Sequence, residues 1–323
     1  MVEKSRDPKP PSSAQTAEDL GFDLDRALRS IVSIRTNIPE DAFTAPILGV
    51  SRAGSGVVIR DSGLVLTIGY LITEAESVWL TTASGRVVPA HALALDPVSG
   101  FGLVQPLGDL ALPALELGRS SDAALGDRVI VAAGGARQFV RAEIVAKQEF
   151  SGYWEYYLPE VIFTRPAHPF WGGAGLIGRD GKLLGIGSLH VERVSDEGAE
   201  DTNMIVPIDL LNPVLGDLLA HGRPDTPPRP WLGVYCSEDR GKVVIGDVVE
   251  QGPAAAAGMR AGDVVSAVRD SAVAILRDFY LKVWSCGSAG VEIPIEIVRD
   301  GRSHWLRVKS ADRASLFKKP RLH

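Results

Sequence analysis

The sequence predicts a mainly β protein built from two folded units, and three observations lead to this prediction. From Ile31 onward, short apolar runs alternate with Gly, Pro and Asp, a pattern typical of β-barrels and sandwiches. Residues 221–230 hold four prolines in ten positions, which indicates a stiff linker. Behind this linker, about 90 residues contain further β segments and two short helical ones. The 323 residues, 45% of them hydrophobic, suffice for two cores.

The N-terminal part combines a polar tail with a short apolar stripe. Residues 1–18 are polar and proline-containing, so we expect them to be disordered. Leu24, Leu28 and Ile31 then follow at i, i+4 and i+7 and predict an amphipathic helix whose apolar face needs a partner surface. The first residues lack the apolar segment of a signal peptide, and no run of about 18 apolar residues follows. We therefore expect a cytoplasmic protein without a membrane span, or a periplasmic one if an export signal has been removed.

The middle of the chain predicts strands in close succession. The clearest apolar runs are 54–59, 63–68, 77–82, 86–95, 101–106, 128–133 and 181–189. Residues 204–222 predict a strand followed by a helix that Gly222 ends. The second unit supplies the β segments WLGVYC, KVVIGDVV, DVVSAVRD, VEIPIEIVRD and HWLRVKS and the helices AAAAGM and DFYLKVWS. The predicted boundaries are 1–18 for the tail, 19–222 for the first unit, 223–230 for the linker, 231–313 for the second unit and 314–323 for a basic tail.

Charge and cysteine content exclude several classes of function. The formal net charge is −6 and no basic block stands out, so a nucleic-acid partner is not expected. Cys236 and Cys286 are expected to be reduced thiols, with a disulfide as the alternative. The six histidines are scattered and no glycine-rich loop matches a nucleotide-binding pattern, so we expect no metal and no cofactor.

Several ordered motifs resemble the HtrA family over about residues 30 to 310. They are GSGVVI, SGRVVPAHALALDPVSGFGLV, LPALELGRSSDAALGDRVIVAAGG, MIVPIDLLNPVLGDLLAHG and GPAAAAGMRAGDVVSAV. The resemblance implies a trypsin-like double β-barrel over 19–222, followed by a PDZ domain, a β sandwich with two helices, over 231–313. It also implies homo-trimers formed through the start of the protease domain, where the Leu24, Leu28 and Ile31 stripe needs burial.

The positions that carry the family's catalytic triad hold other residues here. Tyr70 stands where the family has its histidine, Gly100 where it has its aspartate, and Gly172 where it has its serine. Glycine has no side chain to attack a carbonyl, and a phenol with a pKa near 10 is a poor base at neutral pH. We therefore predict a degenerate triad: a catalytically inactive pseudoprotease, not an enzyme, that acts as scaffold, chaperone or regulator.

Two other functions remain open alongside this one. The first is an active HtrA-type serine endopeptidase that uses an unrecognised nucleophile. The second is a structural subunit that partners an active paralogue. Gly172 and Gly173 could present N–H groups as an oxyanion hole does, but a tight turn is the preferred explanation.

The resemblance places a peptide-binding groove in the PDZ domain. Its carboxylate-binding loop would present backbone N–H groups to a peptide C-terminus while the peptide adds a strand to the sheet edge. The helix near Arg277–Ser285 would form the other wall. The predicted peptide-binding residues are Trp231, Leu232, Gly233, Val234, Phe279 and Val283. The alternative is a PDZ domain that only packs on its neighbour.

An aromatic cluster precedes the predicted nucleophile segment. The cluster supports either ordinary loop packing or, together with Phe170 and Trp171, a filled substrate pocket or a partner surface. Its members are Tyr153, Trp154, Tyr156 and Tyr157.

Overall fold

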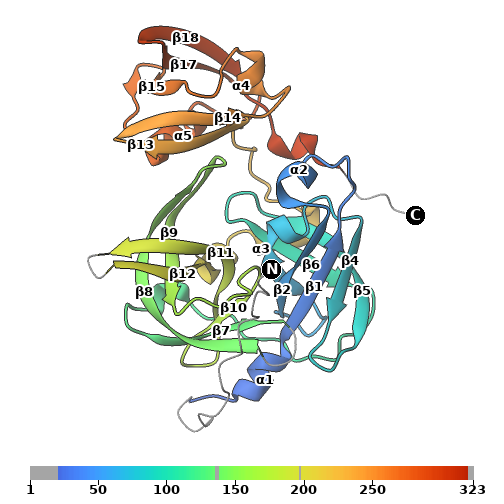
Figure 1. Cartoon of the computed structure of the whole chain (residues 1–323). Coiled ribbons are helices and arrows are strands. Elements are labelled where there is room, and N and C mark those ends of the chain that lie inside the picture. The colour runs from blue at the N-terminus through green and yellow to red at the C-terminus, as the bar shows by residue number, and fades with distance from the viewer. Residues whose placement is uncertain (1–20, 135–137, 196–197, 319–323) are drawn as a thin grey trace, which may run out of the picture.

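The computed structural model describes residues 21–134, 138–195 and 198–318, and it consists of two closed β-barrels and a third, separate sheet (Figure 1). This confirms the predicted mainly β fold class. The predicted disordered tail at 1–18 lies outside the described residues. Within the described part of the chain, no helix is long and apolar enough to cross a membrane.

The first barrel closes in the strand order β1-β2-β3-β6-β5-β4. Strands β2 to β6 lie at the predicted apolar runs, because each run has turn residues at its ends, whereas β1 was not among the predicted runs. Phe101–Pro106, for example, was predicted with its observed ends. The bounds are β1 Ile31–Asn37, β2 Ser51–Val58, β3 Val65–Ile68, β4 Ser77–Thr81, β5 Val87–Leu95 and β6 Phe101–Pro106.

The second barrel closes in the order β10-β11-β12-β9-β8-β7. The long hairpin of β8 and β9 was not predicted, since charged residues interrupt the apolar pattern of β8. This hairpin rises out of the barrel toward the third sheet (Figure 1). The bounds are β7 Arg128–Ala133, β8 Gln138–Gly152, β9 Tyr156–Arg165, β10 Gly175–Ile177, β11 Leu183–Ser195 and β12 Gly198–Pro207.

The predicted N-terminal helix is shorter than its apolar stripe suggested. Helix α1 spans Leu24–Arg29, with the Asp23 side chain accepting a hydrogen bond from the Arg26 N–H as its N-cap. Ile31 already belongs to β1, because the chain turns at Ser30. Leu28 and Ile31 are both buried in the core of their own chain. The stripe is therefore covered within the monomer, and it does not require a partner subunit.

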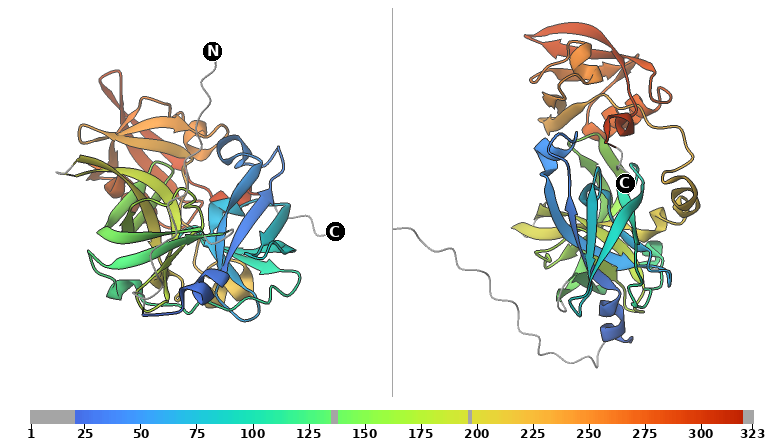
Figure 2. Two further views of the ribbon diagram at one scale, coloured as in Figure 1. Left: turned by 60° about the horizontal axis from the view of Figure 1, so that its bottom comes forward. Right: turned by 90° about the vertical axis from the view of Figure 1, so that its right-hand side faces the viewer.

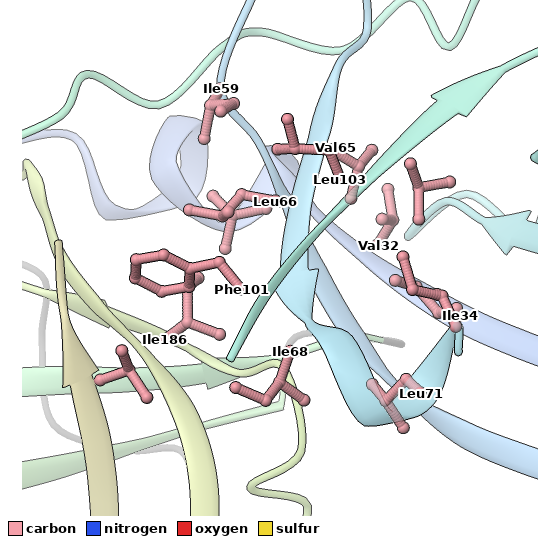
Figure 3. Close-up of a cluster of buried hydrophobic side chains, with 14 of the residues drawn as sticks. Val32, Ile34, Ile59, Val65, Leu66, Ile68, Leu71, Phe101, Leu103 and Ile186 are labelled. Atoms are coloured by element: carbon pink, nitrogen blue, oxygen red, sulfur yellow. The ribbon is translucent and has the colours of Figure 1, made fainter. Parts of the chain in front are cut away.

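One hydrophobic core joins the two barrels. Phe101 on β6, Ile68 on β3 and Ile186 on β11 lie together in this core, and none is more than 2% exposed (Figure 3). Burying a side chain of this size stabilises the fold by roughly 2 kcal/mol. The facing surfaces of the barrels are thus held rigidly, and the loops at their junction have fixed positions.

The third sheet has the order β13-β14-β15-β17-β18, with β16 paired to β15. Helix α5 buries Leu276, Phe279, Tyr280 and Val283 against it, at the i, i+3, i+4 and i+7 spacing of one helix face. Strand β13 is the first strand of this order, so one of its edges, called the free edge below, pairs with no other strand of the sheet. The bounds are β13 Val234–Asp239, β14 Lys242–Val248, β15 Val264–Val268, β16 Ser271–Ala272, β17 Glu292–Arg299, β18 Arg302–Lys309, α4 Pro253–Ala256 and α5 Leu276–Trp284.

Short helices mark the connections. Helix α3 ends at Gly222, which adopts the left-handed conformation at its C-cap, as predicted. After β18 the chain returns to the first barrel, where the Phe317 ring lies 6.0 Å from the Phe43 ring (Figure 2). The short helices of the connections are α2 Ala45–Leu48, α3 Leu215–His221 and the 3-10 helices η2 Gly69–Leu71, η3 Ser120–Asp122, η4 Ile208–Leu210 and η5 Arg313–Leu316.

Candidate functional site

The three predicted triad positions meet at the junction of the barrels. Tyr70 lies in η2, directly after β3, and its hydroxyl donates a hydrogen bond to the Ser188 carbonyl at 3.0 Å. A Cβ atom on Gly172 would lie 2.7 Å from that hydroxyl. Gly100 joins the group through the backbone, since the Gly69 N–H donates to its carbonyl at 2.7 Å. The fold therefore brings Tyr70, Gly100 and Gly172 together.

The Tyr70 hydroxyl is held as a neutral donor. Burial, the largest cause, raises the pKa of Tyr70 well above its usual value of 10, and a hydrogen bond with Trp171 offsets this only in part. At neutral pH the phenol keeps its proton, so it donates to a carbonyl and does not act as a base.

The glycine turn at the predicted nucleophile segment is shaped by its neighbours. Gly173 has φ +76°, and a Cβ atom there would lie 1.9 Å from the Ser55 carbonyl oxygen. Its N–H donates to the Gly187 carbonyl at 2.8 Å. Because this N–H already has a partner within the fold, it is not directed at a ligand. These contacts favour the tight turn over the oxyanion hole.

The predicted carboxylate-binding loop already holds a carboxylate. The backbone N–H groups of Leu232, Gly233 and Val234, which we call the carboxylate cradle, all donate to the Glu155 carboxylate. The distances to its oxygens are 2.9, 2.7 and 3.1 Å respectively. Trp231 stands outside the cradle, because its N–H donates to the Ala311 carbonyl.

The predicted side-chain pocket is closed in this conformation. Leu232, Val234, Phe279 and Val283 all belong to the core of the third sheet, and none is more than 2% exposed. A ligand side chain reaches them only if the atoms that cover them move. The role of these residues in peptide binding stays a prediction.

Sequence reasoning singled out the aromatic residues on both sides of Glu155 but missed Glu155 itself and its contacts with the third sheet. The Cys236 N–H donates to the Tyr153 carbonyl at 2.8 Å, and the Tyr280 hydroxyl donates to the Gly152 carbonyl at 2.8 Å. Burial raises the pKa of both the Cys236 thiol and the Tyr280 phenol. The sequence feature that could have indicated Glu155 is a single acidic residue within a run of aromatic ones, Tyr-Trp-Glu-Tyr-Tyr.

A shallow groove of about 310 Å³ lies between this hairpin tip and the third sheet. Cys236 and Cys286 are both free thiols, and Cys236 borders the groove. In the described parts of the chain, no cluster of His, Cys, Asp and Glu is arranged to hold a metal ion.

Two family models match the two folded units. The trypsin-like peptidase domain matches residues 54–186, and the PDZ domain matches residues 230–309. The chain thus combines a trypsin-like peptidase domain with a C-terminal PDZ domain.

The curated relatives are named serine endoproteases. A probable periplasmic serine endoprotease DegP-like from Pseudomonas fluorescens is 27% identical over 263 residues, covering 77% of this chain and 54% of the relative. The serine endoprotease DegS from Haemophilus influenzae is 28% identical over 230 residues, covering 68% of this chain and 65% of the relative. The chain therefore spans about half to two thirds of the length of these relatives.

Solved structures support the same architecture. The HtrA-type protease AlgW with decapeptide matches with a TM-score of 0.55 and 22% identity, over 92% of this chain and 98% of that one. The serine endoprotease from Yersinia pestis matches with a TM-score of 0.52 and 21% identity, over 90% and 96%. At these identities the likeness shows the fold alone.

These relatives contradict two of the sequence-based predictions. The prediction that the chain is not an enzyme is wrong in their light, because they are named serine endoproteases and point to a protease. It rested on three aligned positions, whereas catalysis depends on side chains that folding gathers from any part of a chain. The expected cytoplasmic location is contradicted by the periplasmic names. That expectation rested on the first residues alone, and folded domains carry no mark of their compartment.

Proposed function

We propose that this chain is a periplasmic HtrA-type protein that recognises peptides or protein C-termini through its PDZ domain. The carboxylate cradle is the observation that carries the proposal. Three consecutive N–H groups converge on one carboxylate within 3.1 Å, a geometry that suits the terminal carboxylate of a peptide. We include Trp231, Leu232, Gly233, Val234, Phe279 and Val283 in the proposed binding site.

The free edge of β13 supports the same proposal. A peptide whose carboxylate sits in the cradle would continue along β13, as an added strand does. The Cys236 N–H already pairs with a carbonyl from outside the sheet, so this edge accepts such a partner. One anchored side chain and a few strand hydrogen bonds suggest roughly micromolar affinity.

The proposal is tested by titrating the full chain with a fluorescein-labelled decapeptide that ends in Leu-Val. The free acid is expected to bind at least tenfold more tightly than the C-terminal amide, because the amide loses the charge-assisted bonds to the cradle. Equal affinity of the two peptides would refute carboxylate recognition.

A matched pair of glycine variants isolates the cradle. Gly233 has φ +79°, and a Cβ atom there would lie 3.1 Å from the Trp231 ring. Gly241 has φ +71° with nothing within 4 Å of its Cβ position. Gly233→Val is expected to abolish binding of the free acid. Gly241→Val introduces similar backbone strain away from the loop and is expected to leave the affinity unchanged.

A second candidate function is serine-type endopeptidase activity, which the names of the curated relatives favour. We propose that Tyr70, Gly100 and Gly172 correspond to the family's triad positions, so a nucleophile must come from elsewhere. Ser188 on β11 is our candidate at this place, since its carbonyl accepts from Tyr70. His190, on the same strand, has its Nε2 atom 3.6 Å from Asp201 Oδ1.

Labelling with a fluorophosphonate probe tests this second candidate. The candidate predicts covalent labelling of Ser188 and loss of casein cleavage in Ser188→Ala, whereas Ser62→Ala, a loop variant, keeps both. If neither labelling nor cleavage is detected, endopeptidase activity is excluded and peptide recognition remains to be judged by the binding experiment.

A further inference from the structure

The tip of the β8–β9 hairpin reaches from the second barrel into the PDZ domain (Figure 1). At this tip Glu155 adopts φ 58°, a left-handed conformation that residues other than glycine rarely take. Its carboxylate accepts the three hydrogen bonds of the carboxylate cradle. The backbone thus takes an unfavourable conformation where the side chain makes its strongest contacts.

The same tip makes backbone contacts of the kind that a bound peptide makes. The Tyr153 carbonyl accepts from the Cys236 N–H on the free edge of β13 at 2.8 Å. On the opposite side, the Tyr280 hydroxyl of α5 donates to the Gly152 carbonyl at 2.8 Å and accepts from the Glu155 N–H at 3.2 Å. The tip therefore lies between β13 and α5, with its carboxylate in the cradle and a backbone hydrogen bond to the strand.

We propose that residues 152–155 are an internal ligand of the PDZ domain, so that a peptide C-terminus binds only by displacing Glu155 from the cradle. This inference rests on the proposed function, because it names the regulation of the same site. The two carboxylates exclude each other, since the three N–H groups cannot serve both at these distances. The intact chain is then a closed state, and a C-terminal peptide shifts it toward an open one.

Displacement of the hairpin tip would also affect side chains at the junction of the barrels. The Trp154 ring stacks on the Tyr156 ring, with centroids 5.5 Å apart and planes 13° apart. The Tyr156 hydroxyl donates to the Ser99 carbonyl at 2.6 Å, next to Gly100. A ligand that removes Glu155 from the cradle therefore disturbs the stack of Trp154 on Tyr156, which ends beside the triad positions. This disturbance is expected to change the fluorescence of Trp154.

A second link between hairpin and PDZ domain provides a control. Arg277 on α5 pairs with Glu149 at 3.0 Å, and both side chains are about 40% exposed. Exposed pairs of this kind contribute little to stability. Glu149 faces the PDZ domain but makes no contact with the cradle. Glu149→Gln therefore makes the same chemical change as Glu155→Gln, from a carboxylate to an amide, at a different contact of the hairpin.

The experiment compares the full chain with its Glu155→Gln, Glu155→Ala and Glu149→Gln variants. Hydrogen exchange at Leu232, Gly233 and Val234 is measured without any peptide. Glu155→Ala, which leaves the cradle without an acceptor, is expected to exchange at least tenfold faster at these amides. Glu155→Gln, a neutral mimic of the protonated carboxyl that keeps a carbonyl acceptor, and Glu149→Gln are each expected to exchange less than twofold faster. The decapeptide ending in Leu-Val is then expected to bind Glu155→Ala at least tenfold more tightly than the parent chain, as a free acid only.

The outcomes separate this inference from the proposed function. Unchanged exchange in Glu155→Ala would overturn the internal ligand, as would an acid-specific peptide affinity of this variant equal to that of the parent chain. Faster exchange without any preference for the free acid would leave Glu155 as the occupant of the cradle and would instead refute peptide recognition.

Discussion

In the cradle, hydrogen bonds from three backbone amides replace the water around the Glu155 carboxylate, and they compensate only in part for its burial. Burial, the largest cause, raises its pKa to about 7, while the hydrogen bonds of the cradle and the charge of Arg313 lower it. A group with this pKa changes its charge in the physiological range. The contact that closes the PDZ domain is thus sensitive to pH.

We predict that the free-acid peptide binds the full chain more tightly as the pH rises from 5 to 7. In the closed state Glu155 keeps its proton up to about pH 7, whereas a released Glu155 gives it up near its ordinary value of 4.5. Opening therefore releases a proton and is favoured as the pH rises through this window. The expected gain is on the order of 2 kcal/mol, roughly thirtyfold in affinity, measured by peptide titration at pH 5, 6, 7 and 8.

The groups that face Glu155 do not titrate in this window. Arg313 stays charged, and burial raises the pKa values of Tyr235, Cys236 and Tyr280 above their usual range. Glu155→Gln is therefore expected to bind the peptide equally well at pH 5 and 8. A pH dependence that persists in this variant would assign the titration to another group.

We predict that Gly172→Ala destabilises the trypsin-like domain by about 1 to 3 kcal/mol, because its Cβ would lie 2.7 Å from the Tyr70 hydroxyl. Tyr70→Phe removes that oxygen together with its hydrogen bond to Ser188, at a cost of about 1 kcal/mol. The double variant is expected to lose less than the sum, with a coupling of about 1 kcal/mol in urea unfolding. Gly216→Ala, with nothing near its Cβ position, serves as the control. Strict additivity would show that the two residues do not touch.

At the scale of elements, the connection between β9 and β10 is fixed to β12 by one amide side chain. Asn203 accepts from the His168 N–H at 2.6 Å and donates to the His168 carbonyl at 3.2 Å. The Phe170 N–H in turn donates to His168 Nδ1 at 3.0 Å. Burial, the largest cause, lowers the pKa of His168, which keeps this nitrogen an acceptor. The segment leading to Gly172 is thereby positioned.

We predict that Asn203→Ala lowers the free energy of unfolding by about 1 to 3 kcal/mol, since two buried backbone groups lose their partner. Asn37→Ala removes an exposed hydrogen bond to Ser77 and is expected to cost less than about 0.5 kcal/mol. Urea unfolding of both variants compares the two. Equal losses would mean that the buried pair contributes no more than a surface contact.

At the scale of the whole molecule, the PDZ domain is attached at two places. One is the β8–β9 hairpin, with its tip at the cradle and its Glu149–Arg277 ion pair. The other is the junction where the Trp231 ring lies 5.9 Å from the Phe43 ring and the Lys318 N–H donates to Glu74 at 2.8 Å. The second attachment shares no residue with the cradle contacts of Glu155, so it can persist when the hairpin tip leaves the cradle. Ligand exchange at the cradle is thus compatible with an intact chain.

We predict that the protein is a homo-trimer, with a mass by light scattering of about three times 34.5 kDa. The Leu24, Leu28 and Ile31 stripe no longer argues for this, because its own barrel covers it. Exposed apolar side chains at Ile47, Leu48 and Val50, on and beside α2, offer another contact surface. Ile47→Lys with Val50→Lys is expected to give monomers if this surface is used. A monomeric parent chain at tens of micromolar would contradict the prediction.

The sequence by itself determined the mainly β fold class, strands with a clear apolar pattern such as β6, and the order of the two domains, because periodicity and glycine positions act over a few residues. It did not determine the β8–β9 hairpin, whose apolar pattern is interrupted by charged residues. The loop at 231–234 was located through the resemblance to the HtrA family, which depends on a motif that is continuous in the chain. Only the tertiary structure brought Glu155 to that loop from 77 residues away and set the Tyr70 hydroxyl against Ser188. Such contacts depend on how the β8–β9 hairpin and the two barrels pack in space, and no local pattern encodes that packing. The resemblance therefore indicated where a carboxylate would bind, and the fold decided which carboxylate occupies the site.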